Sequence, residues 1–277
     1  CVPKESVPKL TELSRYVSEL ANMPPDNRQP FVGQSVFAHK GGMHVSALLR
    51  HPETYEHIPP ESVGNRRRVL VSELSGASNI IYKAAEYNVE LKKDSPALRK
   101  VVNTVKELEH QGYHFEGAEG SFELILKKAL GIYRPYFELI GFRLTIDKRD
   151  PDDEPWAEAS IKVRVGEQVI HTVADGNGPV NALDMALRKA LESVYPQISR
   201  IKLADYKVRV LNERAGTGAK VRVLITSTED GRSWGTVGVS TNIIEASWRA
   251  LVDSIEYGLM SIDAAPVGTQ GVASQSG

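Results

Sequence analysis

Two histidines and one tyrosine in the first quarter of the sequence are the residues best suited to chemistry. His39 and His44 lie five positions apart on either side of Gly41 and Gly42, and Tyr55 follows in a proline-rich segment. Imidazole transfers protons near neutral pH, and a phenol donates or orients a proton. The two glycines allow a tight backbone path that presents His44.

Composition alone leaves other interpretations of these residues open. Five positions is not the i, i+4 spacing of paired helical metal ligands, and no third ligand lies close by, so a metal site is poorly supported. A structural or surface role is the commoner outcome for such histidines. Tyr55 in a proline-rich loop usually packs its ring on the surface. The triplet 66–68, three arginines, is an anion site, a solvated face or part of a subunit contact.

The overall composition is that of an ordinary globular protein without electrostatic specialisation. The chain has 277 residues, with 34 Lys and Arg against 35 Asp and Glu. This balance argues against nucleic acid or an anionic membrane as a partner. The single cysteine, Cys1, excludes an internal disulfide, and no apolar run approaches the roughly 20 residues that span a bilayer. We expect a cytoplasmic protein and, because it starts with Cys1, part of a longer chain.

The first half of the chain is predicted to be helical around a long irregular stretch. Apolar residues at helical spacing predict four helices, which cover residues 8–21, 73–87, 98–108 and 122–130. Residues 22–69 show no sustained period, and so long a stretch is usually functional or a linker. The expected divisions are a linker subdomain at 1–70, a helical subdomain at 71–135, a regulatory domain at 136–262 and a disordered tail at 263–277.

The second half contains an internal repeat. The aligned pairs are 139–146 with 203–210, 162–165 with 220–223, and 182–194 with 246–258. The first strand and the helix share an offset of 64 residues. Each unit is therefore predicted to run strand, strand, strand, helix, and two such units would form one α+β domain with helices on one face of the sheets.

The loop from Gly176 to Asn181 precedes the first helix of this repeat. It offers backbone N–H groups and a helix N-terminus, which together suit a carboxylate ligand. The alternative is a simple strand-to-helix turn in which Asn181 is the N-cap residue. Both interpretations can hold at once.

Several segments together resemble the region after the catalytic barrel in the α-isopropylmalate and homocitrate synthase family. The segments are 39–44, 55–64, 71–80, 176–179 and 205–206. The resemblance covers residues 1 to about 262, and the variants Lys-Gly-Gly-Met-His and Gly-Ala-Ser-Asn are closer to the citramalate synthase branch. It implies helical linker subdomains followed by a duplicated βββα regulatory domain. No eightfold strand–helix alternation is present, so the TIM barrel is absent.

The resemblance implies an acyltransferase that condenses acetyl-CoA with a 2-oxo acid, which is pyruvate in the citramalate branch. It implies that His44 and Tyr55 reach into a barrel, His44 as general base or water activator and Tyr55 as orienter or proton donor. The family's divalent metal (Mg, Mn or Zn) is held in the barrel. We therefore expect no metal site or cofactor in this chain, and no activity from it alone.

The resemblance further implies a homodimer that is feedback-inhibited by a branched-chain amino acid. Isoleucine inhibits citramalate synthases, in isoleucine biosynthesis, and leucine inhibits isopropylmalate synthases. The implied pocket consists of Gly176, Asn177, Gly178, Val180, Asn181, Leu203, Asp205 and Tyr206. Asp205 would bind the α-ammonium group. One methylene is worth only about 1–3 kcal/mol, so the sequence does not separate isoleucine from leucine.

Two rival functions remain to be weighed. A free-standing amino-acid-binding module would explain residues 137–262 but not the histidine-rich linker before them. An RNA-binding α+β domain would need a basic sheet face with exposed aromatic rings. Basic residues do alternate on two predicted strands, but the net charge of -1 and the few aromatic residues argue against that function.

Overall fold

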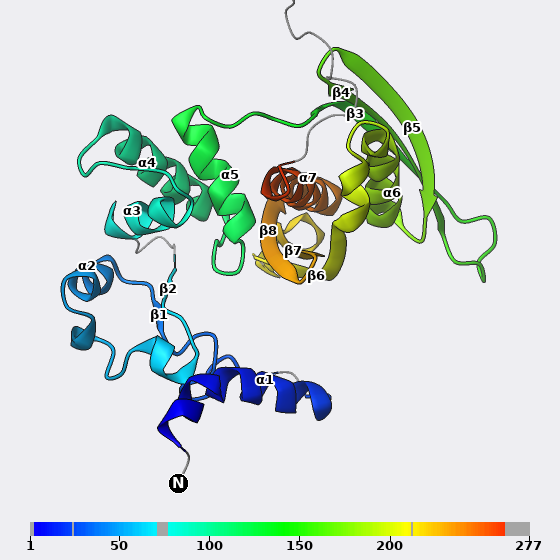
Figure 1. The fold of residues 1–277 in the computed structure, drawn as a ribbon. Helices are drawn as coiled ribbons and strands as arrows, with labels where there is room; N and C mark the ends of the chain where they lie inside the picture. The colour runs from blue at the N-terminus through cyan, green and yellow to red at the C-terminus, as the bar shows by residue number, and fades with distance from the viewer. Residues whose placement is uncertain (1–2, 24, 71–76, 212, 264–277) are drawn as a thin grey trace, which may run out of the picture. The chain divides into compact units, whose positions relative to one another are not determined.

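The computed structural model describes residues 3–23, 25–70, 77–211 and 213–263 (Figure 1). Its contacts divide the chain into two compact units, Cys1–Glu109 and His110–Gly277. Residues 71–76 of the Ser-Gly segment and nearly all of the expected tail lie outside the described residues. The division at residues 70 and 135 stays a prediction.

The first unit is built from short helices joined by irregular segments. Its elements are η1 (Lys4–Lys9), α1 (Leu10–Leu20), β1 (Ala38–His39), α2 (Gly42–Arg50), η2 (Pro52–Thr54), η3 (Pro60–Val63), β2 (Arg68–Val69), α3 (Ala77–Glu86) and α4 (Pro96–Gln111). β1 and β2 pair in parallel, so residues near 38 and near 68 lie side by side. The predicted helices at 8–21, 73–87 and 98–108 correspond to α1, α3 and α4.

Helix α2 was missed by the sequence analysis, which placed the segment in a glycine-rich loop. The helix begins directly at Gly42, and Gly41 is its N-cap in an extended conformation. Val45 and Leu48 are its buried residues. Glycine has low helix propensity, and nine residues give too short a period to recognise. Tertiary burial of this small apolar face stabilises the helix instead.

The second unit is an α+β domain made of two sheets. Its elements are α5 (Glu119–Leu130), β3 (Glu138–Asp147), β4 (Trp156–Val165), β5 (Gln168–Gly176), α6 (Pro179–Glu192), η4 (Pro196–Arg200), β6 (Lys202–Val210), η5 (Glu213–Gly218), β7 (Val221–Glu229), β8 (Arg232–Ser240) and α7 (Ile243–Ser261). The antiparallel sheets have the orders β3-β4-β5 and β6-β7-β8. The predicted duplicated βββα architecture is confirmed.

The repeat holds at the level of single hydrogen bonds. Thr172 Oγ1 donates to the Ala186 carbonyl at 2.8 Å, and Thr236 Oγ1 donates to the Ala250 carbonyl at 2.7 Å. The two threonines are 64 positions apart in the sequence, and so are the two alanines. Each hydrogen bond joins the last strand of a sheet to the helix that covers that sheet. The two repeats therefore pack their helices in the same way.

The predicted alignment of the middle strands is wrong. Ile161 pairs with Phe142, and Ile225 pairs with Tyr206, so β4 and β7 are also related by 64 positions rather than 58. The similarity of 162–165 to 220–223 is a slip of six residues along an alternating pattern. Side chains in a strand repeat every two residues, so a slip by an even number preserves the pattern and escapes notice.

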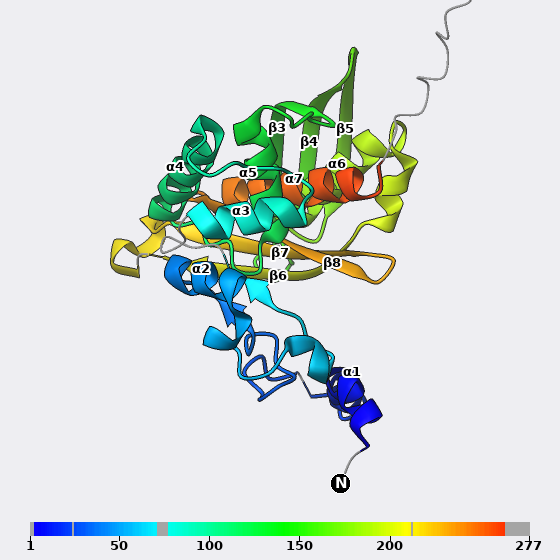
Figure 2. The same ribbon diagram turned by 60° about the vertical axis from the view of Figure 1, so that its left-hand side comes forward.

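One hydrophobic core joins the two repeats, with α6 and α7 between the sheets (Figure 2). Ile161 and Ile225 from the central strands and Leu187 and Leu251 from the helices occupy equivalent buried positions. Burying each such side chain contributes about 1.5–3 kcal/mol. In the described part of the chain, no helix combines the length and apolar character that crossing a membrane requires.

Candidate functional site

The structure brings His44 and Tyr55 together. Their rings are stacked, with centroids 4.2 Å apart and planes 21° from parallel. His44 is the third residue of α2, and Tyr55 directly follows η2. His44 is exposed, and Tyr55 is 47% exposed. The pair is therefore presented at the surface of the first unit.

A buried charged cluster lies beside this pair in the sequence, and the sequence analysis did not find it. His39 Nε2 and Glu56 Oε1 are 3.0 Å apart, and Arg67 Nε donates to the same oxygen at 2.8 Å. A second Arg67 nitrogen donates to Glu56 Oε2, which makes the contact bidentate. The Glu56 side chain is 2% exposed. A bidentate arginine with a second donor is a geometry that satisfies a buried carboxylate.

This cluster keeps Glu56 ionised. Burial alone would raise the pKa of the Glu56 carboxyl, but the hydrogen bonds from Arg67 and His39 lower its pKa overall. The hydrogen bond to Glu56 raises the pKa of Arg67. The two charges therefore stabilise each other inside the first unit.

The cluster also fixes the segments that carry the stacked pair. Glu56 directly follows Tyr55, and His39 lies on β1, a few residues before His44. Asn79 on α3 adds a further tie, because its Nδ2 donates to the carbonyls of Lys40 and Leu70 at 2.9 and 3.0 Å. Adjacent buried anchors restrict the backbone on both sides of the His44–Tyr55 stack.

No metal site is found in the described residues. Across residues 3–23, 25–70, 77–211 and 213–263, no three His, Cys, Asp or Glu side chains gather closely enough to hold an ion. The His39–Glu56 pair is instead completed by an arginine, which is repelled by a cation.

The predicted effector loop has a tight geometry. A Cβ at Gly176 would lie 2.3 Å from the Ala182 nitrogen, so β5 can turn into α6 only with glycine there. Gly178 is the N-cap residue, and Asn181 is the third residue of α6 rather than the predicted N-cap. Pro179 suits the first helical position and shifts the start of the helix toward Gly178. The Asn181 side chain accepts the Asn177 N–H at 3.1 Å.

The predicted effector residues on β6 do not all share one face. A bulge between Leu203 and Asp205 places Leu203 opposite the buried Ser227 and Tyr206 opposite the buried Ile225, although Leu203 itself is 39% exposed. Tyr206 Oη lies 2.7 Å from the Ser247 hydroxyl.

Asp205 lies on the other face of β6, because neighbouring residues in a strand alternate. Its carboxylate pairs with Lys207, and this hydrogen bond lowers the pKa of Asp205. Within one chain, Tyr206 therefore contacts Ser247 of α7, whereas Asp205 contacts Lys207 on the opposite face of β6.

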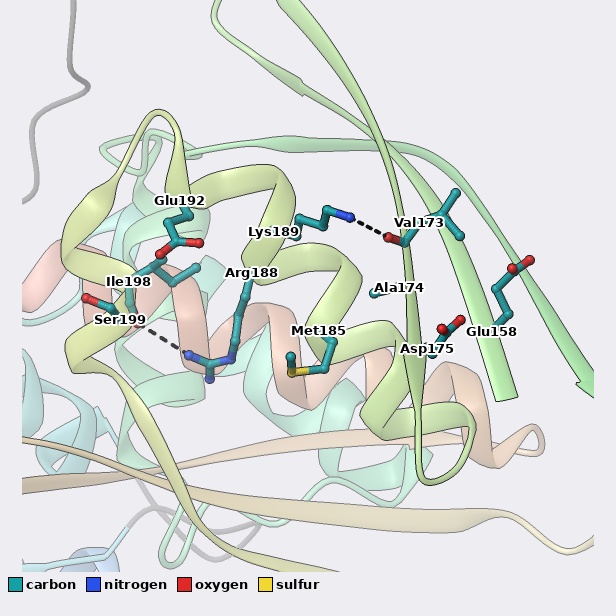
Figure 3. Close-up of a pocket in the computed structure, with 10 residues that line it drawn as sticks. All are labelled: Glu158, Val173, Ala174, Asp175, Met185, Arg188, Lys189, Glu192, Ile198 and Ser199. Atoms are coloured by element: carbon teal, nitrogen blue, oxygen red, sulfur yellow. Dashed lines mark hydrogen bonds between the residues drawn. The ribbon is translucent and has the colours of Figure 1, made fainter. Parts of the chain in front are cut away.

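A cavity of about 800 Å³ lies between β5 and α6 (Figure 3). It is lined by Glu158, Val173, Ala174, Asp175, Met185, Arg188, Lys189, Glu192, Ile198 and Ser199. None of the eight predicted effector residues lines this cavity, although Asp175 directly precedes Gly176. The cavity was not foreseen, because it depends on the packing of a helix against a strand edge.

Comparison with family models decides the relationship of the second unit. Residues 116–259 match the LeuA allosteric (dimerisation) domain. The chain belongs to this family. Residues 31–113 match a second model, described as the homocitrate synthase post-HMGL domain-like family. The two matches meet close to the division between the two compact units.

Individual relatives of this LeuA-type chain point to one enzyme. It is 56% identical to an (R)-citramalate synthase of Geobacter sulfurreducens and 53% identical to one of Aquifex aeolicus, each over 94% of the chain and 49% of the relative. A 2-isopropylmalate synthase of Methanocaldococcus jannaschii is 28% identical over 89% of the chain and 46% of the relative. The chain spans about half the length of these curated relatives. The resemblance to the carboxy-terminal part of citramalate synthases is confirmed.

Proposed function

We propose that this chain is the linker and regulatory part of an acyltransferase that condenses acetyl-CoA with pyruvate to (R)-citramalate. The observation that carries the proposal is the 56% identity to an (R)-citramalate synthase over 94% of the chain. The 28% identity to a 2-isopropylmalate synthase makes leucine biosynthesis the second candidate. The match of residues 31–113 to a post-HMGL domain disfavours a free-standing sensor.

In this proposal His44 and Tyr55 complete an active site whose barrel is not part of this chain. His44 takes or relays a proton, and the Tyr55 hydroxyl orients the reacting group or donates a proton. Their stacked, exposed rings support that role, since both can contact groups outside the first unit. A divalent metal in the barrel would polarise the 2-oxo acid carbonyl.

The second unit is proposed to bind isoleucine as a feedback inhibitor. The loop 176–181 would bind the α-carboxylate through backbone N–H groups at the start of α6, which is favoured by the helix dipole. Leu203 and Tyr206, which share one face of β6, would form the apolar wall. Asp205 remains the proposed acceptor of the α-ammonium group, in competition with Lys207, to which its carboxylate is paired.

Isoleucine is expected to raise the melting temperature of the purified chain more than valine does, because binding to the folded state alone stabilises it. Leucine measured at the same concentrations separates the two candidate enzymes, since a larger shift with leucine would favour the second. Tyr206→Ala should reduce the isoleucine shift, and Arg232→Ala, at the exposed first residue of β8, should not. No shift with any branched-chain amino acid would refute the regulatory role.

The chain is proposed to act as a homodimer, as the description of the matched dimerisation domain suggests. Ile146 on β3 and Val210 on β6 occupy equivalent positions of edge strands and are 57% and 47% exposed. Such apolar residues on open strands favour contact with a second copy. Sedimentation of the chain should give twice the monomer mass, and Val210→Asp should shift it toward the monomer.

A further inference from the structure

The two repeats differ in what lies along the outer strand of each sheet. In the second repeat, α5 packs along β8 and against α7 (Figure 1). In the first repeat, the equivalent strand β5 and helix α6 line the cavity of about 800 Å³ (Figure 3). Its lining residues Val173, Lys189 and Glu192 correspond, 64 positions later, to Val237, Asp253 and Glu256. Those three residues are the ones that bind α5 and the segment after it.

The contacts of α5 show how such a groove binds a helix. The backbone N–H of Val237, on the open edge of β8, donates to Ser121 Oγ at 2.9 Å. Ser121 in turn donates to Asp253 Oδ2 at 2.7 Å, and Lys128 Nζ lies 3.5 Å from Asp253 Oδ1. One side chain of α7 therefore engages two residues of α5, a serine and a lysine.

The chain leaving α5 is held by the next carboxylate along α7. Glu256 accepts the backbone N–H of Tyr136 at 3.2 and 3.1 Å from its two oxygens. Glu256 is 1% exposed, and burial raises its pKa, as it does the pKa of Asp253. The groove of the second repeat is thus closed from solvent by residues 119–137.

The first repeat presents a similar groove with its side chains exposed. Val173 is 40% exposed and Met185 is 47% exposed, so both can contact a group bound in the groove. Glu192, at the position of Glu256, is exposed. Lys189, at the position of Asp253, donates to the Val173 carbonyl at 3.1 Å. The charge at this central position is therefore the reverse of that in the second repeat.

One residue limits how closely the analogy can hold. A Cβ at Gly235 would lie 1.7 Å from the Gly117 carbonyl oxygen, so glycine admits the segment that leads into α5. The equivalent residue is His171, whose Nε2 lies 2.8 Å from Ser160 Oγ. Because His171 occupies the equivalent space, a segment bound in the first groove can contact β5 from Val173 onward but not at His171.

We propose that the groove between β5 and α6, defined by Val173, Met185, Lys189 and Glu192, is the docking site for an amphipathic helix of a partner protein. The helix would bury an apolar stripe on Val173 and Met185 and place a carboxylate against Lys189. The reversed charge at Lys189 favours an acidic side chain where α5 presents Lys128, while Glu158, Asp175 and Glu192, which line the same cavity, favour basic side chains around it. A helix in a groove is an established mode of recognition. None of the predicted effector residues lines this groove, although Asp175, which does, directly precedes the effector loop.

The test uses two fluorescein-labelled peptides of residues 119–132, one with the native sequence and one carrying Lys128→Glu. Binding to the purified chain is measured by fluorescence anisotropy. The Lys128→Glu peptide is expected to bind more tightly than the native peptide. Lys189→Glu in the chain should weaken that binding about tenfold, the effect of one charge-assisted hydrogen bond. Arg232→Glu, the same charge change at the exposed first residue of β8, should leave it unchanged.

Met185→Asp is a second variant that keeps the test valid if Lys189→Glu does not fold, since Met185 is exposed. Met185→Asp should also weaken the binding of the Lys128→Glu peptide to the chain. Absence of binding at millimolar peptide, or binding that neither variant weakens, would overturn the proposal. Self-association that falls with Lys189→Glu, without peptide binding, would assign the groove to a second copy and would also overturn it.

Discussion

Replacing Glu56 by alanine is expected to lower the free energy of unfolding of the first unit by about 3–5 kcal/mol, the usual effect of removing one partner of a buried ion pair. The change leaves Arg67 and the His39 ring without the acceptor they share. Urea unfolding monitored by circular dichroism gives the difference. Glu53→Ala, at an exposed position three residues earlier, should change stability by no more than about 0.5 kcal/mol.

The same carboxylate predicts an acid sensitivity with a defined sign. The folded pKa of Glu56 lies below its ordinary value of 4.5, so its contribution is complete above that value and is lost as the pH falls through the folded pKa. Glu56→Gln should remove this part of the acid dependence. If the stability of Glu56→Gln and of the native chain fell in parallel between pH 5 and pH 3, the cluster would not be the stabilising element described above.

His44→Ala is expected to lower kcat by about 10²–10⁴-fold when this chain is joined to the half of the Geobacter sulfurreducens relative that it does not match. The expected loss follows from the proposed role of His44, since the change would remove a group that transfers a proton in the transition state. Tyr55→Phe should give a smaller loss, since the stacked ring stays and only the hydroxyl is removed. The rate of CoA release from acetyl-CoA and pyruvate measures both.

Two controls separate catalysis from folding in that experiment. His51→Ala, an exposed histidine at the end of α2, should leave kcat unchanged. His44→Ala should melt at the temperature of the native fusion, because His44 is exposed. A normal kcat in His44→Ala, together with a fall in kcat for a well-folded His39→Asn, would transfer the proton-moving role to His39.

The sequence predicted the features that depend on local periodicity. The duplicated βββα unit, three helices of the first half and α5 all follow from apolar spacing along the chain. The same periodicity misplaced the middle strand by six residues, because an alternating pattern is unchanged by an even slip. The bulge at Leu203, which puts Leu203 and Tyr206 on one face, leaves no signal in that pattern.

The features that depend on contacts between distant residues were not predictable. His39, Glu56 and Arg67 come from three segments, and nothing in their spacing shows that parallel pairing of β1 and β2 brings them together. The stacking of His44 on Tyr55 likewise depends on α2, whose glycines conceal it. The cavity beside Lys189 depends on how α6 packs against β5, which no pattern in the sequence shows.

The most direct measurement of the proposed regulatory role is CoA release by the isolated chain and by the fusion to the Geobacter sulfurreducens half, each with and without isoleucine. The isolated chain should release no CoA from acetyl-CoA and pyruvate. The fusion should release CoA, and isoleucine should lower its rate, an effect that Tyr206→Ala should weaken. CoA release by the isolated chain, or an active fusion that no branched-chain amino acid inhibits, would contradict the assignment of this chain as a linker and regulatory part.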